Sequence, residues 1–200
     1  YAHGGDWGKQ HDFTAIPTLR IDRLPWTFVV FYRDRRKPYH LMAPHLNRRV
    51  ERYGGVASHD ANGVGIAVGE HLTVPCEWYT QWTGAPRHIL FNEYIAAIEQ
   101  GRVKAPRSLP WYNAHKYVTN DDLYGNGHPP DEFVACALAH RAAVHGVGEL
   151  DFAGGAAHIS AVVETESERT ARERRERVAA EKAVTDEIAA HGVFWPGGGR

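Results

Sequence analysis

The chain has 200 residues, a formal net charge of −1 and an apolar fraction of 43%. Together these values indicate one globular domain with a sizeable core and, at most, an appendage. The charge excludes a uniformly basic nucleic-acid coat, so any contact with a polyanion must be local. Cys76 and Cys136 form no CxxC pattern, which argues against a disulfide framework and favours a reducing cytosol. No apolar run reaches the roughly 18 residues of a membrane span.

The chain begins with Tyr1-Ala2-His3, which is neither an initiator Met nor a signal peptide. We therefore expect an excised domain of a larger polypeptide that is not secreted.

Three strands are predicted within the first 33 residues. Residues 1–7 read as a short strand that ends at Asp6, residues 13–21 keep a broken two-residue alternation, and residues 26–33 are β-branched and aromatic. Their short connections indicate an antiparallel meander. Pro17 interrupts the second run, which predicts a sheet edge or a bulge at that point.

Helical and extended patterns then alternate. The predicted elements are a helix over 40–53 ended by Gly54-Gly55, a strand over 56–60, a helix from 63 to about 72, a strand over 74–79, a helix over 86–100, a loop over 107–129 and a helix over 131–145. This order predicts a mixed α/β domain whose five-stranded sheet combines the meander with parallel strands, flanked by helices. A right-handed crossover would place the ends of the first and fourth strands side by side.

The composition changes after the predicted domain, which we place at residues 1–150. Residues 164–190 alternate Glu and Arg densely, with pairs such as Glu168/Arg172 at i,i+4 spacing. We expect residues 151–200 to form a charged helical extension with a disordered tail. This helix is either exposed to solvent with no partner or an appendage that binds a partner.

Three acidic sites stand at the ends of predicted core elements. Asp6 ends the first strand, Asp60 ends the fourth, and Asp131 opens the last helix with Glu132 beside it. Carboxylates gathered from separate elements would form a cation cage of the kind that Mg²⁺ occupies together with waters and phosphate oxygens. Two such ions roughly 4 Å apart can clamp the attacking and leaving oxygens of a phosphodiester, one activating a water and the other stabilising the 3′ alkoxide.

Each acid also has a structural explanation. Asp6 could be a turn residue, Asp60 could supply turn chemistry or cap the next helix, and Asp131 could be an N-cap or a first-turn acid that the helix dipole favours. The joint position of all three at one sheet edge favours the metal site.

Several segments resemble the nuclease domain of the large terminase subunit of tailed bacteriophages, a member of the RNase H-like superfamily. The matching segments lie within about residues 3–145 and read GDWG (5–8), DFTA (12–15), HDANGVG (59–65), AIEQGRVKAP (97–106) and HPPDEFVACALAH (128–140). The resemblance implies an RNase H-like fold and a metal-dependent endonuclease that cuts concatemeric double-stranded DNA during viral genome packaging.

The resemblance also implies roles for single residues. Asp6, Asp60 and Asp131 would be the catalytic acids and ligands of a two-metal Mg²⁺ or Mn²⁺ site. Asp12 would be an auxiliary metal ligand and Glu132 an alternative third ligand. His128 would be either a further metal ligand or a contact to substrate or to metal-bound water. The family often has paired aspartates where this chain has Asp131-Glu132, and we favour Asp131.

The family implies partners as well. No GxxxxGK[ST] motif occurs, so the expected ATPase motor would be an N-terminal domain of the same polypeptide, absent here. Further partners would be double-stranded DNA, the portal protein and the small terminase subunit, in the cytoplasm of the infected bacterium and without a membrane.

Two arginine-rich segments are candidates for phosphate contacts, and each could equally be a solvated face. They are Arg33, Arg35, Arg36 and Lys37 after the third strand, and Arg48, Arg49 and Arg52 on the first helix. Arg87 is the one match to a basic residue that the family carries after the fifth strand. Other functions left open are a resolvase- or transposase-like nuclease, a non-catalytic docking module of the packaging motor, and a small-molecule phosphatase.

Overall fold

The computed structural model describes residues 1–8 and 12–146. The elements in chain order are β1 (Ala2–Gly5), β2 (Thr14–Arg20), β3 (Trp26–Asp34), α1 (Tyr39–Tyr53), β4 (Val56–Asp60), α2 (Val64–Gly69), β5 (Glu77–Tyr79), α3 (Ala85–Glu99), β6 (Val103–Lys104), α4 (Trp111–Tyr117), α5 (Asn120–Tyr124) and α6 (Asp131–His145). The predicted extension over residues 151–200, with its charged helix, lies outside the described residues. Within the described part, no helix combines the length and apolarity needed to cross a membrane.

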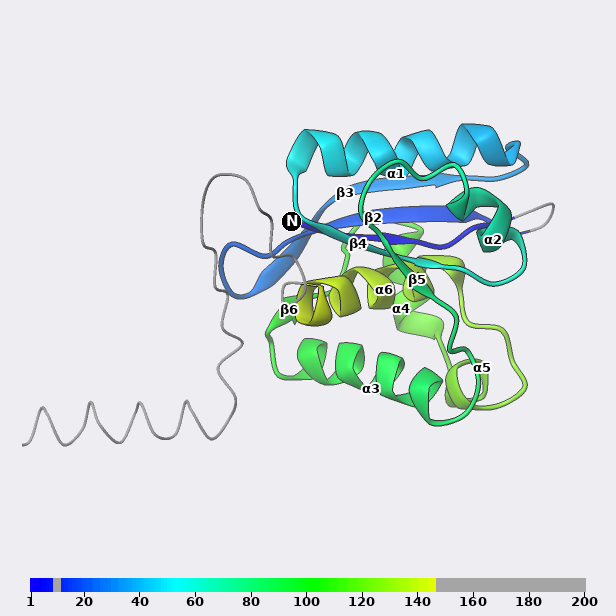
Figure 1. Cartoon of the computed structure of the whole chain (residues 1–200). Coiled ribbons are helices and arrows are strands. Elements are labelled where there is room, and N and C mark those ends of the chain that lie inside the picture. Colours follow the sequence, from blue (N-terminus) through cyan, green and yellow to red (C-terminus); the bar gives the residue numbers. More distant parts are fainter. Residues whose placement is uncertain (9–11, 147–200) are drawn as a thin grey trace, which may run out of the picture. The chain divides into compact units, whose positions relative to one another are not determined.

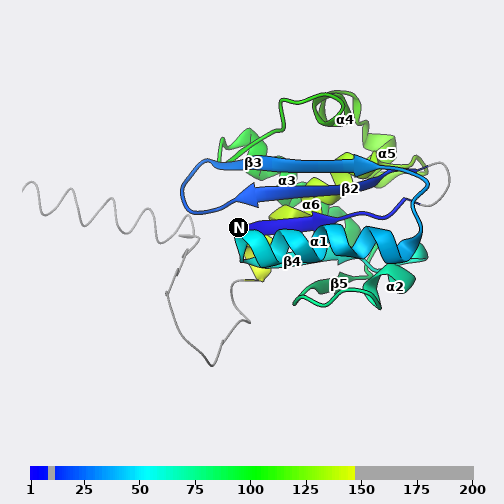
Figure 2. The ribbon, with the colours of Figure 1, turned by 90° about the horizontal axis from the view of Figure 1, so that it is seen from above.

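One mixed sheet of six strands runs through the described residues in the order β5-β4-β1-β2-β3-β6 (Figures 1 and 2). β1, β2 and β3 are antiparallel neighbours, which confirms the predicted meander. β4 lies parallel to β1, and β5 lies parallel to β4. The predicted count of five strands is wrong by one. The additional strand, β6, has only two residues, too few to show an alternating pattern, and pairs with the start of β3.

Pro17 occupies β2, which has a neighbour on each side, so the alternative of a sheet edge is wrong. The alternative of a bulge at Pro17 is nearly right, because a bulge lies next to this residue. The register between β2 and β3 shifts between Thr18 and Leu19, one residue beyond the proline, and the pairing skips Val29. A bulge of this kind bends the strand and increases its twist.

Helices cover both faces of the sheet (Figure 1). α1 and α2 pack on one face around Met42, Leu46 and Val68. α6 lies directly against the other face, and α3 lies beyond it, as Figure 1 shows. The α6 segment 132–140 is buried throughout, so this helix is the centre of the larger core.

The predicted loop over 107–129 is wrong in part, because it contains α4 and α5. α5 begins with a capping box in which Thr119 and Asp122 satisfy each other's backbone N–H groups. The predicted strand over 74–79 is shorter, since β5 begins only at Glu77, after Pro75. α2 ends at Gly69 rather than near residue 72.

Candidate active site

The ends of β1 and β4 bring Asp6 and Asp60 to one edge of the sheet. The two strands are parallel neighbours with Gly5 opposite His59, so the next residue of each strand emerges at the same edge. The Asp6 backbone still exchanges hydrogen bonds of 3.0 and 2.9 Å with Ala15 of β2, which holds the Asp6 backbone in the sheet. α6, which packs on β1 and β4, begins at Asp131.

Asp6 is the most enclosed of these acids, with 9% of its surface exposed. Its Oδ1 accepts a hydrogen bond of 2.9 Å from the Trp7 backbone N–H. Burial raises the pKa of Asp6 well above its usual value, and the negative charges of Asp131, Asp60 and, more weakly, Asp12 raise it further. The structure therefore brings the three other predicted aspartates within electrostatic reach of Asp6.

Asp60 is half-buried, and two donors hold one of its oxygens. Oδ1 accepts hydrogen bonds from the Trp82 indole Nε1 at 2.6 Å and from the Asn62 backbone N–H at 2.9 Å. Burial raises the pKa of Asp60, and both hydrogen bonds oppose that shift. The bond to Asn62 is the predicted turn chemistry. The alternative of a helix cap is wrong, because Gly63 is the N-cap of α2 and no side chain caps it.

Asp131 is the first residue of α6, and Pro130 is the N-cap. The prediction that Asp131 caps the helix is therefore wrong, and the alternative that it is an acid of the first turn is confirmed. Its Oδ2 accepts a hydrogen bond of 2.5 Å from the Phe13 backbone N–H. Burial raises its pKa to about 6; that hydrogen bond opposes the shift, whereas the charges of Asp12 and Glu132 add to it. The neighbouring Glu132 is buried and forms an ion pair with Arg33.

These contacts separate the two candidates for the third acid. Glu132 is engaged with a guanidinium, and Arg33 also lies over the Phe13 ring at 3.1 Å from its centroid. Asp131 remains close enough to Asp6 to raise its pKa. The arrangement favours Asp131, and Glu132 acts as an anchor for the end of β3.

The two auxiliary candidates lie at the surface. Asp12 and His128 are both exposed. Asp12 raises the pKa of both Asp6 and Asp131, and His128 opposes the rise at Asp131. Among residues 1–8 and 12–146, no group of three or more His, Cys, Asp or Glu side chains stands close enough to enclose a metal ion.

The sequence did not predict two of the hydrogen bonds at this edge. The Trp7 indole donates a hydrogen bond of 2.9 Å to Nδ1 of His59, which joins the ends of β1 and β4. Burial lowers the pKa of His59 to about 4, so this ring is neutral and can accept. The second contact is that of Trp82, whose indole is a direct partner of Asp60.

The basic candidates differ in their contacts. Arg87 donates to the Asp122 carbonyl at 2.7 Å and so joins α3 to α5. Arg35 lies 5.3 Å from the Phe13 ring centroid, beside the acidic edge. Arg48, Arg49 and Arg52 lie on α1, on the opposite face of the sheet from α6.

No protein-family model and no curated protein matches the chain. Among solved structures, the large terminase nuclease from thermophilic phage G20c with bound magnesium is 23% identical over 70% of this chain and 80% of that chain, with a TM-score of 0.59. The same nuclease with bound cobalt is 22% identical, with equal coverage and a TM-score of 0.57. The Thermus phage P74-26 large terminase nuclease domain is 19% identical over 70% and 77%, with a TM-score of 0.52. The chain has the RNase H-like fold of these terminase nuclease domains.

Proposed function

We propose that this protein is a divalent-metal-dependent endonuclease that cuts double-stranded DNA. The observation that carries the proposal is the position of Asp6, buried at the end of β1 with the charges of Asp131 and Asp60 close by. Such a group of carboxylates is unfavourable without a counter-charge, and a hard cation supplies that charge. The same fold occurs in nucleases whose structures hold magnesium or cobalt.

The donor set suits Mg²⁺ or Mn²⁺, because Asp6, Asp60 and Asp131 all offer carboxylate oxygens. Asp6, Asp60 and Asp131 would hold the metal, with Asp12 as an auxiliary ligand. Mg²⁺ keeps several waters and needs only one or two direct carboxylates, which fits acids that do not form a closed cage. A bound pair of ions would activate a water and stabilise the leaving 3′ oxygen.

The protein's own groups orient the carboxylates. Trp82 and Asn62 hold Oδ1 of Asp60. Trp7 holds Oδ1 of Asp6 in the same way, and Phe13 holds Oδ2 of Asp131. The protein thus orients each acid through one oxygen, and the other oxygen would bind the metal.

The likeness in fold to terminase nucleases supports a proposed biological setting. The substrate would be concatemeric viral DNA, cut at the start and end of packaging in the cytoplasm of the infected bacterium. An ATPase domain of the same polypeptide, the portal protein and the small terminase subunit would be its partners, and His128 would contact the substrate or a metal-bound water.

The proposal is tested by incubating supercoiled plasmid with the protein and Mg²⁺ or Mn²⁺. We expect nicked and linear products that EDTA suppresses, and no product with Asp6→Asn or Asp60→Asn. Glu70→Gln, at an exposed acid, is the matched control and should cut normally. Equal cleavage by both aspartate variants would remove the proposed mechanism. Packaging activity that persists in Asp60→Asn would indicate a non-catalytic docking module.

A second test concerns Trp82, whose indole orients Asp60. Trp82→Phe keeps a ring for packing against Tyr79, at 5.0 Å between centroids, but removes the hydrogen bond to Oδ1. Loss of a partner that orients a metal ligand costs about 10- to 100-fold in metal affinity or activity. We therefore expect Trp82→Phe to need more Mg²⁺ for half-maximal cleavage. Trp78→Phe is the control, because Trp78 is 46% exposed; equal losses in both variants would contradict this role.

A further inference from the structure

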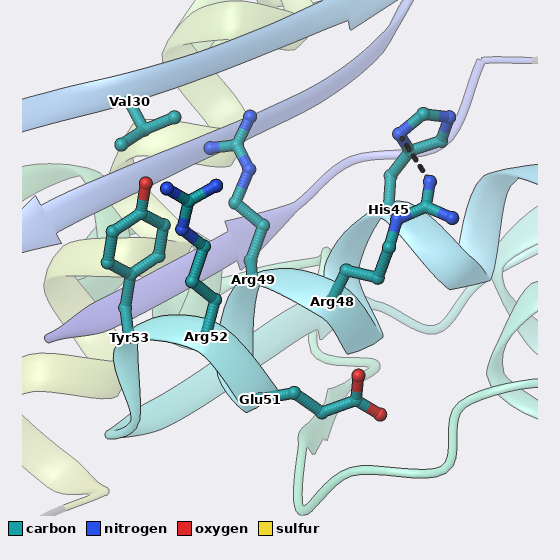
Figure 3. A pocket seen from close by; sticks show the side chains of 7 residues that line it. All are labelled: Val30, His45, Arg48, Arg49, Glu51, Arg52 and Tyr53. Atoms are coloured by element: carbon teal, nitrogen blue, oxygen red, sulfur yellow. Dashed lines mark hydrogen bonds between the residues drawn. The ribbon is translucent and has the colours of Figure 1, made fainter.

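A polar pocket lies between α1 and β3 (Figure 3), and α1 covers the face of the sheet opposite to α6 (Figure 1). Its volume is about 490 Å³, within the range of small-ligand sites. Three guanidinium groups and one imidazole dominate the lining. The lining residues are Val30, His45, Arg48, Arg49, Glu51, Arg52 and Tyr53.

The basic side chains form one stripe along α1. Positions 45, 48, 49 and 52 recur at helical spacing and so share one face. The stripe extends from position 45 to position 52, seven residue steps or about 10 Å along the helix axis. One strand of B-DNA presents about three phosphates over that length.

Arg49 lies at the centre of the stripe and is held in place. Its Nη1 donates a hydrogen bond of 3.0 Å to Oγ1 of Thr18, which is also 3.1 Å from Nδ1 of His3. Burial lowers the pKa of Arg49. The fixed guanidinium keeps its remaining N–H donors for a ligand.

Arg48 is also oriented. Its Nη2 lies 3.3 Å from Nδ1 of His45, and the His45 ring stacks on Tyr32 at 3.9 Å between centroids. Burial and the charges of Arg48 and Arg49 lower the pKa of His45. The imidazole is therefore neutral at neutral pH and accepts from Arg48.

The positive charge of this stripe is not balanced within the described residues. Arginines elsewhere in the described part of the chain form salt bridges, namely Arg20, Arg33 and Arg141. Among the same described residues, Arg48, Arg49 and Arg52 form none. Glu51 lines the same pocket, but Figure 3 shows its carboxylate pointing away from the three guanidinium groups. Guanidinium forks match phosphate oxygens in geometry and charge.

The pocket is separate from the acidic edge. Thr18, which Arg49 contacts, is paired with His3 of β1, and Asp6 lies three residues, about 10 Å, further along that strand. The helix α6, which begins at Asp131, lies on the other face of the sheet (Figure 1).

We propose that this pocket binds the sugar–phosphate backbone of duplex DNA at a second site, beside the stretch presented to the carboxylates. The inference rests on the proposed function, because it takes DNA as the substrate. These contacts are independent of sequence and contribute affinity and orientation rather than chemistry.

The test measures binding of a labelled duplex by fluorescence anisotropy in EDTA, so that no cleavage is required. Arg48→Gln/Arg52→Gln changes two exposed residues, and circular dichroism verifies that the variant folds. We expect affinity to fall roughly tenfold for each phosphate interaction that the variant removes at about 0.1 M salt. The slope of log affinity against log salt should become shallower by about 1.8, about 0.9 for each removed interaction. The control, Arg23→Gln/Arg107→Gln, removes the same charge from exposed positions outside the pocket.

A second measurement reports contact directly. Phenylglyoxal modification of Arg48, Arg49 and Arg52, read by mass spectrometry, should be slowed by duplex DNA. Protection by inorganic phosphate but not by duplex would overturn the proposal in favour of a small-anion site. An unchanged affinity and salt slope in the double variant would overturn it as well.

The outcomes also separate this inference from the proposed function. Asp60→Asn should bind duplex in EDTA at least as tightly as the wild type, because it removes a negative charge, even though it does not cut. A protein that binds through α1 but never cuts refutes only the nuclease. A protein that cuts but binds independently of α1 refutes only the second site.

Discussion

Replacing Asp6 by Asn should stop DNA cleavage and, at the same time, stabilise the metal-free protein at neutral pH. Loss of a group that merely orients a metal ligand costs about 10- to 100-fold, so loss of a ligand should exceed about 100-fold. The stabilisation follows from the raised pKa of Asp6, caused first by burial and then by Asp131 and Asp60. Asn has the same shape, can still accept from the Trp7 N–H, and carries no charge to bury.

The direction in which stability changes with pH is clearest for Asp131. Its pKa is about 6 in the folded protein against an ordinary value of 3.8. Between these values the folded form holds a proton that the unfolded form has released, so the carboxylate destabilises the fold as pH rises from about 4 to about 6. Asp131→Asn removes this effect. Its stability relative to the wild type should therefore increase over that window and then level off.

The comparison must be made between variant and wild type at each pH. His3, His59 and His140 have pKa values lowered to about 4, mainly by burial. They destabilise the fold as pH falls below their ordinary value of 6.5, against the trend of the acids. The histidines are common to both proteins and cancel in the difference.

Thermal melting in EDTA measures the effect. In a chain of this size, about 1 kcal/mol shifts the melting temperature by about 2–4 °C, and we expect at least that gain for Asp6→Asn at neutral pH. Added Mg²⁺ should stabilise the wild type and leave the variant unchanged. Glu70→Gln should melt like the wild type under both conditions. A metal-free Asp6→Asn protein that melts lower at neutral pH would show that the carboxylate is a structural group and not a strained ligand.

The sequence predicts where the acids lie, because Asp6 and Asp60 each stand at the end of a recognisable strand. A glycine-flanked Asp6 after a short apolar strand, and Asp60 after another, predict one sheet edge once the crossover is assumed right-handed. The helix that begins at Asp131 was equally clear from its apolar run. These signals are local in sequence, and the fold needs only one long-range assumption to join them.

The partners of those acids were not accessible, because each depends on a contact between distant segments. Trp82 reaches Asp60 across 22 positions, and Phe13 reaches Asp131 across 118. A tryptophan in an irregular segment gives no periodic signal that separates packing from hydrogen bonding. The sequence also did not predict β6, α4 or α5, for a related reason. A strand of two residues and helices of one or two turns are too short to show a periodic apolar pattern.

Gly4→Ala should cause a large loss of stability at the contact between β1 and α6. A Cβ at Gly4 would lie 1.9 Å from the Ala135 carbonyl oxygen and 2.7 Å from the Ala139 backbone nitrogen. Both are backbone atoms in the middle of α6, a helix buried along residues 132–140, so neither can rotate aside. Overpacking in a core costs about 1–3 kcal/mol and occasionally more, and we expect about 3 kcal/mol or more here, a fall of at least about 6 °C in melting temperature.

The substitution should also impair cleavage in the protein that still folds, because α6 carries Asp131 and must move away from β1 to admit the methyl group. Gly101→Ala is the control: nothing lies within 4 Å of its Cβ, and its φ of 68° costs only about 1–2 kcal/mol. Since the atoms that Gly4 approaches are backbone, adding Ala135→Gly should not rescue the variant. Rescue by that second change, or equal losses at Gly4 and Gly101, would show that α6 can shift on β1 and that their close approach does not fix the third acid.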